Sequence, residues 1–151
     1  MTNAVRIWKI HEQERVDKEM YYVSTEKKID IRQLMKLMKQ TYWAPERSEE
    51  DVLTAVKNSI SFGAFDEEDN LVGFARVVTD FVSIWYLCDV IVDEKHRGQG
   101  IGKMLISAVT SDERFAKASA LLKTKDAHGL YRKYGFCDVD TNRVMYRDKR
   151  D

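Results

Sequence analysis

A glycine-rich turn that joins an apolar segment to a helix is the feature of this sequence that most restricts its fold. Residues 84–92 are apolar except for Asp89, residues 97–103 read Arg-Gly-Gln-Gly-Ile-Gly-Lys, and apolar residues then recur at helical spacing over 101–109. The first N–H groups of a helix have no partner within it, and glycines leave them uncovered. Together with the helix dipole, these groups form a site suited to a phosphate or pyrophosphate.

The spacing of the glycines excludes two common nucleotide-binding motifs. The pattern GxxxxGK[ST] of a P-loop is absent. The dinucleotide fingerprint GxGxxG is not formed either, because Leu105 stands where a glycine would have to follow Gly100 and Gly102. The turn alone is as compatible with a simple helix cap as with phosphate binding.

Hydrophobic periodicity elsewhere predicts one α/β layered domain. Asp30 and Ser48 are the expected N-caps of two helices, the second of which runs to about Ser59. A further short helix is expected over 127–134. Strands are expected over 20–25, 61–65, 71–79, 84–92, 118–123 and 143–147. Residues 1–18 are expected to form an appendage, and residues 19–151 a single domain.

Composition excludes several classes of protein. Lys and Arg number 25 and Asp and Glu also number 25, which disfavours a nucleic-acid partner. The two cysteines form no disulfide framework and no metal-ligand spacing, so no metal is expected. No apolar run approaches the roughly 20 residues of a membrane span, and the charged N-terminus lacks a signal-peptide core. These features indicate a cytoplasmic protein without a membrane partner.

Two segments of the chain resemble the GNAT superfamily of acetyl-CoA-dependent N-acyltransferases. Residues 97–102 match its pyrophosphate loop, [RQ]-x-x-G-x-[GA], and residues 89–93 resemble its fourth strand. Residues 127–136, AHGLYRKYGF, resemble its segment A-x-x-[LF]-Y-x-[KR]-x-G-F. The motifs lie in the family's order, and the expected elements agree with it from about residue 20 to 150. The resemblance implies a mixed, mostly antiparallel central sheet with helices on both faces.

The resemblance also implies a binding site for acetyl-CoA as co-substrate. The fourth strand splays from the fifth, and main-chain groups of Val90, Ile91 and Val92 would contact the pantetheine arm and the acetyl carbonyl. Thr124 stands where many members have an asparagine that binds the same arm, and a hydroxyl can still hydrogen-bond there. The residues of the turn would hold the pyrophosphate: Arg97, Gly98, Gln99, Gly100, Ile101, Gly102 and Lys103.

In this family a primary amine attacks the thioester directly, without an acyl-enzyme. Tyr131 falls on the tyrosine that protonates the departing thiolate, although it could simply pack its helix on the sheet. Asp89 is the best candidate for the general base. A carboxylate within an apolar strand is costly to bury, which suggests that it has a specific role. The alternatives are a structural carboxylate hydrogen-bonded to a neighbouring loop and a proton route through water.

The resemblance implies that the acceptor is a small-molecule or peptide amine. Tyr42, Trp43 and Glu46 lie where this family builds its acceptor pocket, and Phe81 precedes the fourth strand; packing and an ordinary turn are the alternatives. Residues 41–95 carry 12 acidic and 4 basic side chains, whereas residues 96–151 carry 7 acidic and 12 basic. This distribution favours a cationic acceptor beside the acidic segment. A homodimer is common in the family.

A non-catalytic sensor or regulatory module that binds acetyl-CoA is the alternative function. Tyr131 favours the enzyme. The family often places its base at the positions of Tyr86 and Cys88, and neither residue is a convincing base, which favours the sensor.

Overall fold

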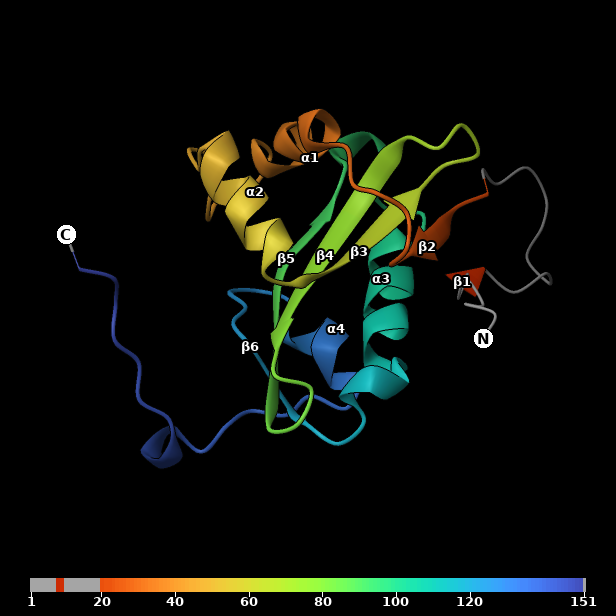
Figure 1. Ribbon diagram of the computed structural model, residues 1–151. Helices are drawn as coiled ribbons and strands as arrows, with labels where there is room; N and C mark the ends of the chain where they lie inside the picture. Colours follow the sequence, from red (N-terminus) through yellow and green to blue (C-terminus); the bar gives the residue numbers. More distant parts are fainter. Residues whose placement is uncertain (1–7, 10–19, 151) are drawn as a thin grey trace.

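A six-stranded mixed sheet forms the centre of the computed structural model, which describes residues 8–9 and 20–150 (Figure 1). The strands lie side by side in chain order; only β5 and β6 are parallel. Of the predicted appendage, only Trp8 and Lys9 lie within the described residues, and they pair with β2. The strands are β1 (Trp8–Lys9), β2 (Tyr22–Ser24), β3 (Ile60–Phe65), β4 (Leu71–Thr79), β5 (Ile84–Val92) and β6 (Ser119–Leu122).

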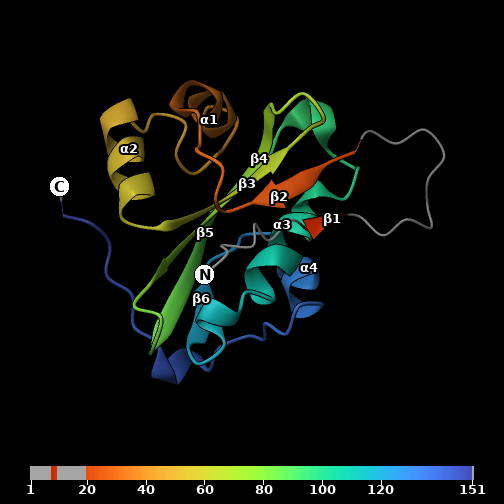
Figure 2. The ribbon, with the colours of Figure 1, turned by 45° about the vertical axis from the view of Figure 1, so that its right-hand side comes forward.

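Helices cover both faces of the sheet, as the family resemblance implies (Figure 2). One face packs on α1 (Ile31–Met38) and α2 (Glu49–Lys57). The other packs on α3 (Ile101–Thr110) and on the segment of α4 (His128–Arg132). The sheet therefore separates two apolar cores, and the fold class predicted from the sequence is confirmed.

The first two helices begin at the predicted caps. The Asp30 carboxylate accepts a hydrogen bond from the N–H of Arg32 at 2.8 Å, and the Ser48 hydroxyl accepts one from the N–H of Asp51 at 3.1 Å. Each bond satisfies one of the N–H groups that a helix start leaves unpaired. The loop between the two helices is thus held at both ends above the sheet.

A β-bulge interrupts the pairing of β4 with β5. Phe74 pairs with Ile91 and Arg76 with Cys88, so two residues of β5, Asp89 and Val90, face Ala75 alone. Asp89 adopts a positive φ of 52°, which is uncommon outside glycine. The bulge reverses the alternation of β5: Leu87 packs into the core under α3, whereas Ile91 packs into the core under α1 and α2.

The ladder between β5 and β6 is short. It begins at Ile84↔Ser119 and ends at Leu87↔Leu122, although β5 continues to Val92. The strands therefore diverge, as the family resemblance implies, and no strand of the described residues lies beside the edge of β5 beyond Leu87 on that side.

The strand predicted over 143–147 is wrong. Residues 141–143 form a short 3-10 turn, and residues 144–150 have no strand partner in the described structure. Met145 is 98% exposed and Tyr146 67%. An alternating pattern indicates β propensity, but a strand also needs the edge of another strand to pair with. The many charged residues around this segment favour its exposure to water.

No helix in the described ranges combines the length and apolar character that crossing a membrane requires.

The close packing of α3 on β4 gives a test of this fold. A Cβ at Gly73 would lie 2.9 Å from Ile101 Cγ2 and 3.2 Å from Ala64 Cβ, whereas one at Gly129 would meet nothing within 4 Å. Gly73→Ala should therefore lower the free energy of unfolding by about 1–3 kcal/mol through overpacking. Gly129→Ala, in the helix α4, should leave it equal or raise it by up to about 1 kcal/mol. Urea denaturation measures both; equal stability of the two variants would contradict the packing described.

Candidate active site

A pocket of about 630 Å³ lies beside the diverging ends of β5 and β6. Its lining includes residues from the α1–α2 loop, β4, β5 and the segment that follows β6. It brings together six of the residues predicted for the site, Tyr42, Trp43, Asp89, Val90, Thr124 and Tyr131, with Tyr86 and Cys88 at the family's usual base positions. The pocket lining does not include Glu46 or Phe81. Glu46 is exposed on the α1–α2 loop, and Phe81 stacks on Phe115 with ring centroids 6.1 Å apart.

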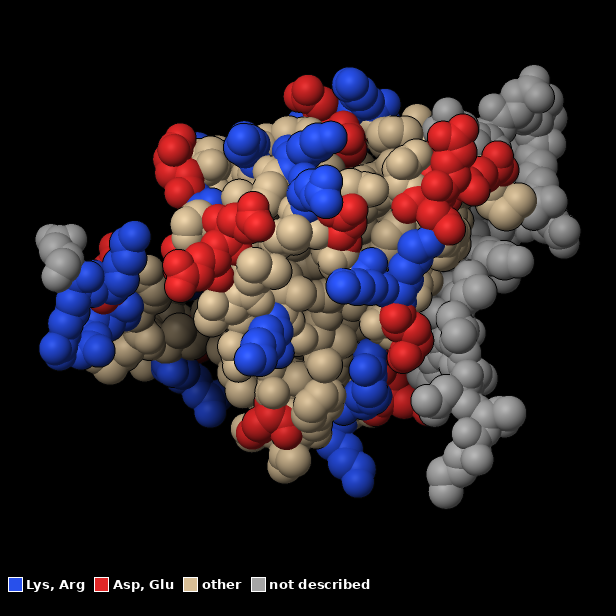
Figure 3. Space-filling model, turned by 45° about the horizontal axis from the view of Figure 1, so that its top comes forward, with Lys and Arg blue, Asp and Glu red and all other residues tan. Residues whose placement is uncertain are grey.

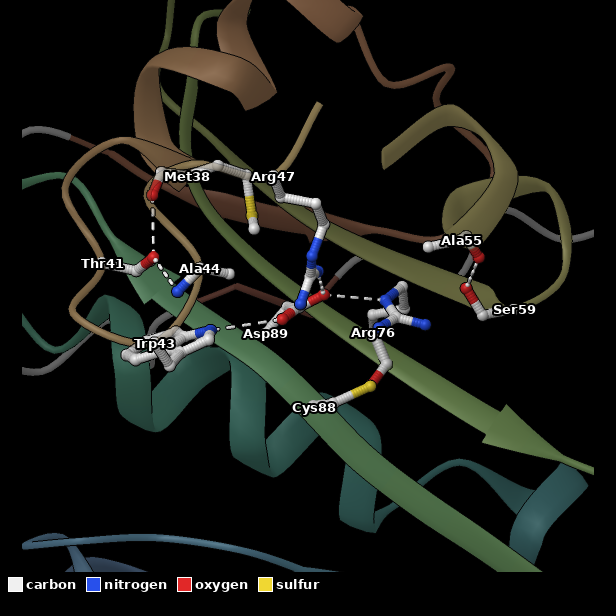
Figure 4. Close-up of polar contacts among 10 residues, drawn as sticks. All are labelled: Met38, Thr41, Trp43, Ala44, Arg47, Ala55, Ser59, Arg76, Cys88 and Asp89. Atoms are coloured by element: carbon white, nitrogen blue, oxygen red, sulfur yellow. Dashed lines mark hydrogen bonds and ion pairs between the residues drawn. The ribbon is translucent and has the colours of Figure 1, made fainter. Parts of the chain in front are cut away.

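Asp89 is the most heavily bonded side chain of the pocket (Figure 4). Its Oδ2 accepts hydrogen bonds from Arg47 Nη1 and Arg76 Nε, both at 2.9 Å, and its Oδ1 accepts one from Trp43 Nε1 at 3.3 Å. The carboxylate is only 5% exposed. The bulge makes these contacts possible, because an unbroken alternation would turn Asp89 to the same face as Leu87.

The contacts of Asp89 are those expected of a structural carboxylate bonded to a neighbouring loop. A general base needs an accessible lone pair that can reach the proton it removes. Three donors already occupy the two oxygens of Asp89. Its role as a base stays a prediction, and the geometry favours a role in positioning the α1–α2 loop and the two arginines.

Tyr131 projects from α4 toward the pocket. Its ring packs edge-on against Phe136, with centroids 5.8 Å apart, and its hydroxyl has no hydrogen-bond partner among the described residues. Burial raises the pKa of this phenol above its usual range, and nearby Tyr42 adds a smaller effect in the same direction. Tyr131 therefore keeps its proton at neutral pH and is available as an acid.

Cys88 also lines the pocket, but it is a poor nucleophile. Burial, opposed in part by the charge of Arg76, raises the pKa of its thiol to about 11. The thiolate is the reactive form of cysteine, so little of it is present at neutral pH. The Cys88 sulfur instead lies 3.5 Å from the Arg76 carbonyl oxygen and can donate to it.

The glycine-rich turn has the backbone that its sequence predicts. Gly98 and Gly100 have φ values of 77° and 86°, and Gly100 is the N-cap of α3, a residue without a side chain to cap the free N–H groups. A Cβ on either glycine would meet nothing within 4 Å. The helix start is therefore open to an anion of some size.

Hydrogen bonds hold the turn against the sheet. Arg97 Nε donates to the carbonyl oxygen of Val92 at 3.3 Å. The buried Tyr21 hydroxyl donates to Gln99 Oε1 at 2.9 Å and also lies 2.9 Å from His96 Nδ1. A hydroxyl has one proton to give, so with Gln99 as its acceptor, His96 Nδ1 must be the donor in the second bond.

Thr124 helps to shape the start of α4. Its hydroxyl accepts a hydrogen bond from the N–H of Ala127 at 3.0 Å while the residue lines the pocket. Arg76 is a site residue that was not singled out from the sequence. A lone arginine inside the apolar strand β4 was the available signal, since a charge there needs a partner.

Within residues 8–9 and 20–150, no three His, Cys, Asp or Glu side chains gather where they could hold a metal ion.

Comparisons with known proteins agree with this geometry. The family described as the acetyltransferase (GNAT) domain matches residues 57–138. The uncharacterized N-acetyltransferase ycf52 of Pyropia yezoensis is 32% identical over 135 residues, which are 83% of this chain and 75% of that protein. The ycf52 protein of Porphyra purpurea is 27% identical over 142 residues, or 88% of this chain and 80% of that protein.

Solved structures show the same fold. A protein of the GNAT family from Xanthomonas campestris pv. campestris has a TM-score of 0.78 and 35% identity, over 85% of this chain and 93% of that chain. The GNAT family N-acetyltransferase YhbS of Escherichia coli, solved in complex with CoA, has a TM-score of 0.65 and 20% identity, over 82% of this chain and 72% of that chain. The domain match covers more than half of the sequence and both of its motifs, so this chain belongs to the GNAT family of acetyltransferases.

Proposed function

We propose that this acyltransferase moves the acetyl group of acetyl-CoA to a primary amine by direct attack in a ternary complex. The observation that carries the proposal is the position of Tyr131, which lines the same pocket as Val90, a residue on the part of β5 that does not pair with β6. An extended ligand could pair with that strand edge and present a thioester to the phenol.

The glycine-rich turn suits the pyrophosphate of the co-substrate. Positive φ at Gly98 and Gly100 and the open space around them leave main-chain N–H groups accessible at the start of α3. Arg97 and Lys103 add positive charge at the two ends of the turn. Acetyl-CoA would supply the acetyl thioester, and these residues would bind its phosphates.

The bulge in β5 supports transition-state stabilisation. A bulge leaves one residue outside the ladder, and here Asp89 and Val90 together face Ala75. We assign the main chain at Val90 to the acetyl carbonyl oxygen, which gains negative charge as the amine attacks. Fixed N–H donors near a developing oxyanion lower the barrier because they need no reorganisation.

Protons and bonds balance without a covalent enzyme intermediate. The C–N bond forms as the C–S bond breaks, the attacking nitrogen loses a proton to water, and the leaving thiolate takes the proton of Tyr131, which solvent restores. The raised pKa of Tyr131 keeps that proton in place at neutral pH. The raised pKa of Cys88 supports direct transfer, because its thiol is mostly protonated.

A thiol-release assay with acetyl-CoA over a panel of primary amines tests this function. Turnover of at least one amine, with the acetylated product found by mass spectrometry, is the expected result. Acetyl-CoA binding by calorimetry without turnover of any amine would instead support a sensor and reject the enzyme.

Replacing Tyr131 with phenylalanine tests its role as the acid. Tyr131→Phe should lower kcat by about 10²–10⁴-fold, the usual effect of losing a general acid, with the KM for acetyl-CoA little changed. Tyr134→Phe is the matched control: it lies just after the same helix, outside the pocket, and its hydroxyl bonds only the Lys103 carbonyl oxygen. Equal kcat in the two variants would assign Tyr131 to packing.

Two substitutions of equal shape test the phosphate site. Asparagine and aspartate both tolerate the left-handed backbone of Gly100 better than other side chains, and only aspartate is charged. Gly100→Asp should weaken acetyl-CoA binding at least tenfold more than Gly100→Asn, and added salt should reduce the difference by screening. Isothermal titration measures both affinities; equal weakening would rule out a phosphate at this turn.

A further inference from the structure

The wall of the pocket is predominantly basic, contrary to the acidic character of the surrounding sequence. Of the acidic residues within 41–95, only Asp89 lines the pocket. On the face of the molecule that Figure 3 shows, acidic and basic side chains lie next to one another in several places. The lining has four basic side chains and two acidic ones: Arg47, Arg76, Lys123 and Lys125, with Asp89 and Asp126.

One carboxylate serves two guanidinium groups in this wall. Arg47 uses Nη1 and Arg76 uses Nε to reach the same Asp89 oxygen. Arginine has five N–H donors, and the other four of each residue have no partner among the described residues. The two arginine side chains are only 28% and 13% exposed. Asp89 therefore leaves about one positive charge uncompensated at a partly buried surface.

We infer that the acceptor amine also carries an anionic group, a carboxylate or a phosphate, which the unused N–H donors of Arg47 and Arg76 bind. A partly buried charge without a counter-ion is costly, and a second anion removes that cost. The planar fork of arginine matches both kinds of oxyanion. This inference rests on the proposed function and narrows its substrate class.

Matched pairs of amines test the inference through the thiol-release assay. The pairs are β-alanine with β-alaninamide and phosphoethanolamine with ethanolamine, and longer ω-amino carboxylates cover a wider span. The anionic member should have a kcat/KM at least about tenfold higher, as expected for hydrogen bonds between charged groups. The ratio of kcat/KM for the anionic amine to kcat/KM for the neutral amine is then compared between the two pairs. The pair with the larger ratio shows whether the wall prefers a carboxylate or a phosphate.

Variants of the protein then test which residues produce the preference for anionic amines. Arg76→Gln should reduce the anionic preference about tenfold or more through the acceptor KM, with the KM for acetyl-CoA unchanged. Asp89→Asn, which frees both arginines, should increase the preference. Arg76→Gln combined with Asp89→Asn repeats the first test with Arg47 no longer paired to a carboxylate, and thermal unfolding checks that each variant folds. Arg32→Gln, on the exposed side of α1, is the control.

The possible outcomes separate the inference from the function. Equal kcat/KM for charged and neutral amines overturns the inference and leaves the acetyltransferase function intact. A change confined to the KM for acetyl-CoA in Arg76→Gln also overturns it, because the arginines would then bind the co-substrate. Failure of every amine to react rejects the proposed function, and the inference with it.

Discussion

The ion pairs of buried Asp89 join three separate elements of the chain. Arg47 comes from the α1–α2 loop, Arg76 from β4 and Asp89 from β5. Removal of one partner from a buried ion pair typically costs about 3–5 kcal/mol, because the remaining charge is left uncompensated. The shape and the charge of the pocket wall both depend on this cluster. The β5 bulge is its precondition, since it turns Asp89 toward the loop.

The divergence of β5 from β6 has a comparable effect on the other side of the pocket. An unpaired strand edge is ordinarily a liability, because it can pair with another chain. Here the free edge lies between the glycine-rich turn that begins α3 and the side chain of Tyr131. An extended ligand could therefore satisfy main-chain groups of β5 while its phosphates lie at the helix start. The geometry suits a long, flexible co-substrate with an anionic end.

Much of the local structure could be predicted from short-range chemistry. Asp30 and Ser48 cap their helices, and the glycines at 98 and 100 adopt positive φ because their turn requires it. The family resemblance in turn predicted several residues that line one pocket, including Tyr131 and Thr124. These features depend on neighbours within a few residues or on a motif, and both can be read from the sequence.

Other features required long-range information. The pattern at 143–147 is strand-like, but no strand edge lies beside it in the described structure. Phe81 lies in the turn between β4 and β5. It packs on Phe115 because the chain after α3 passes close to that turn. Arg76 gave only a weak signal, since its importance comes from a carboxylate 13 residues away on the next strand. Each outcome depends on which surfaces meet after folding.

The sequence by itself determined the order of the elements from β2 to α4, the helix caps, the glycine-rich turn and the family resemblance. Those features follow from periodicity, backbone preference and motif spacing, which act locally. Tertiary structure alone decided the charge of the pocket. Apart from Asp89, no acidic residue of 41–95 is buried or lines the pocket, whereas arginines from a loop and a strand converge on Asp89. Electrostatic interactions depend on distance in space and on burial, and neither can be obtained by counting charges along the chain.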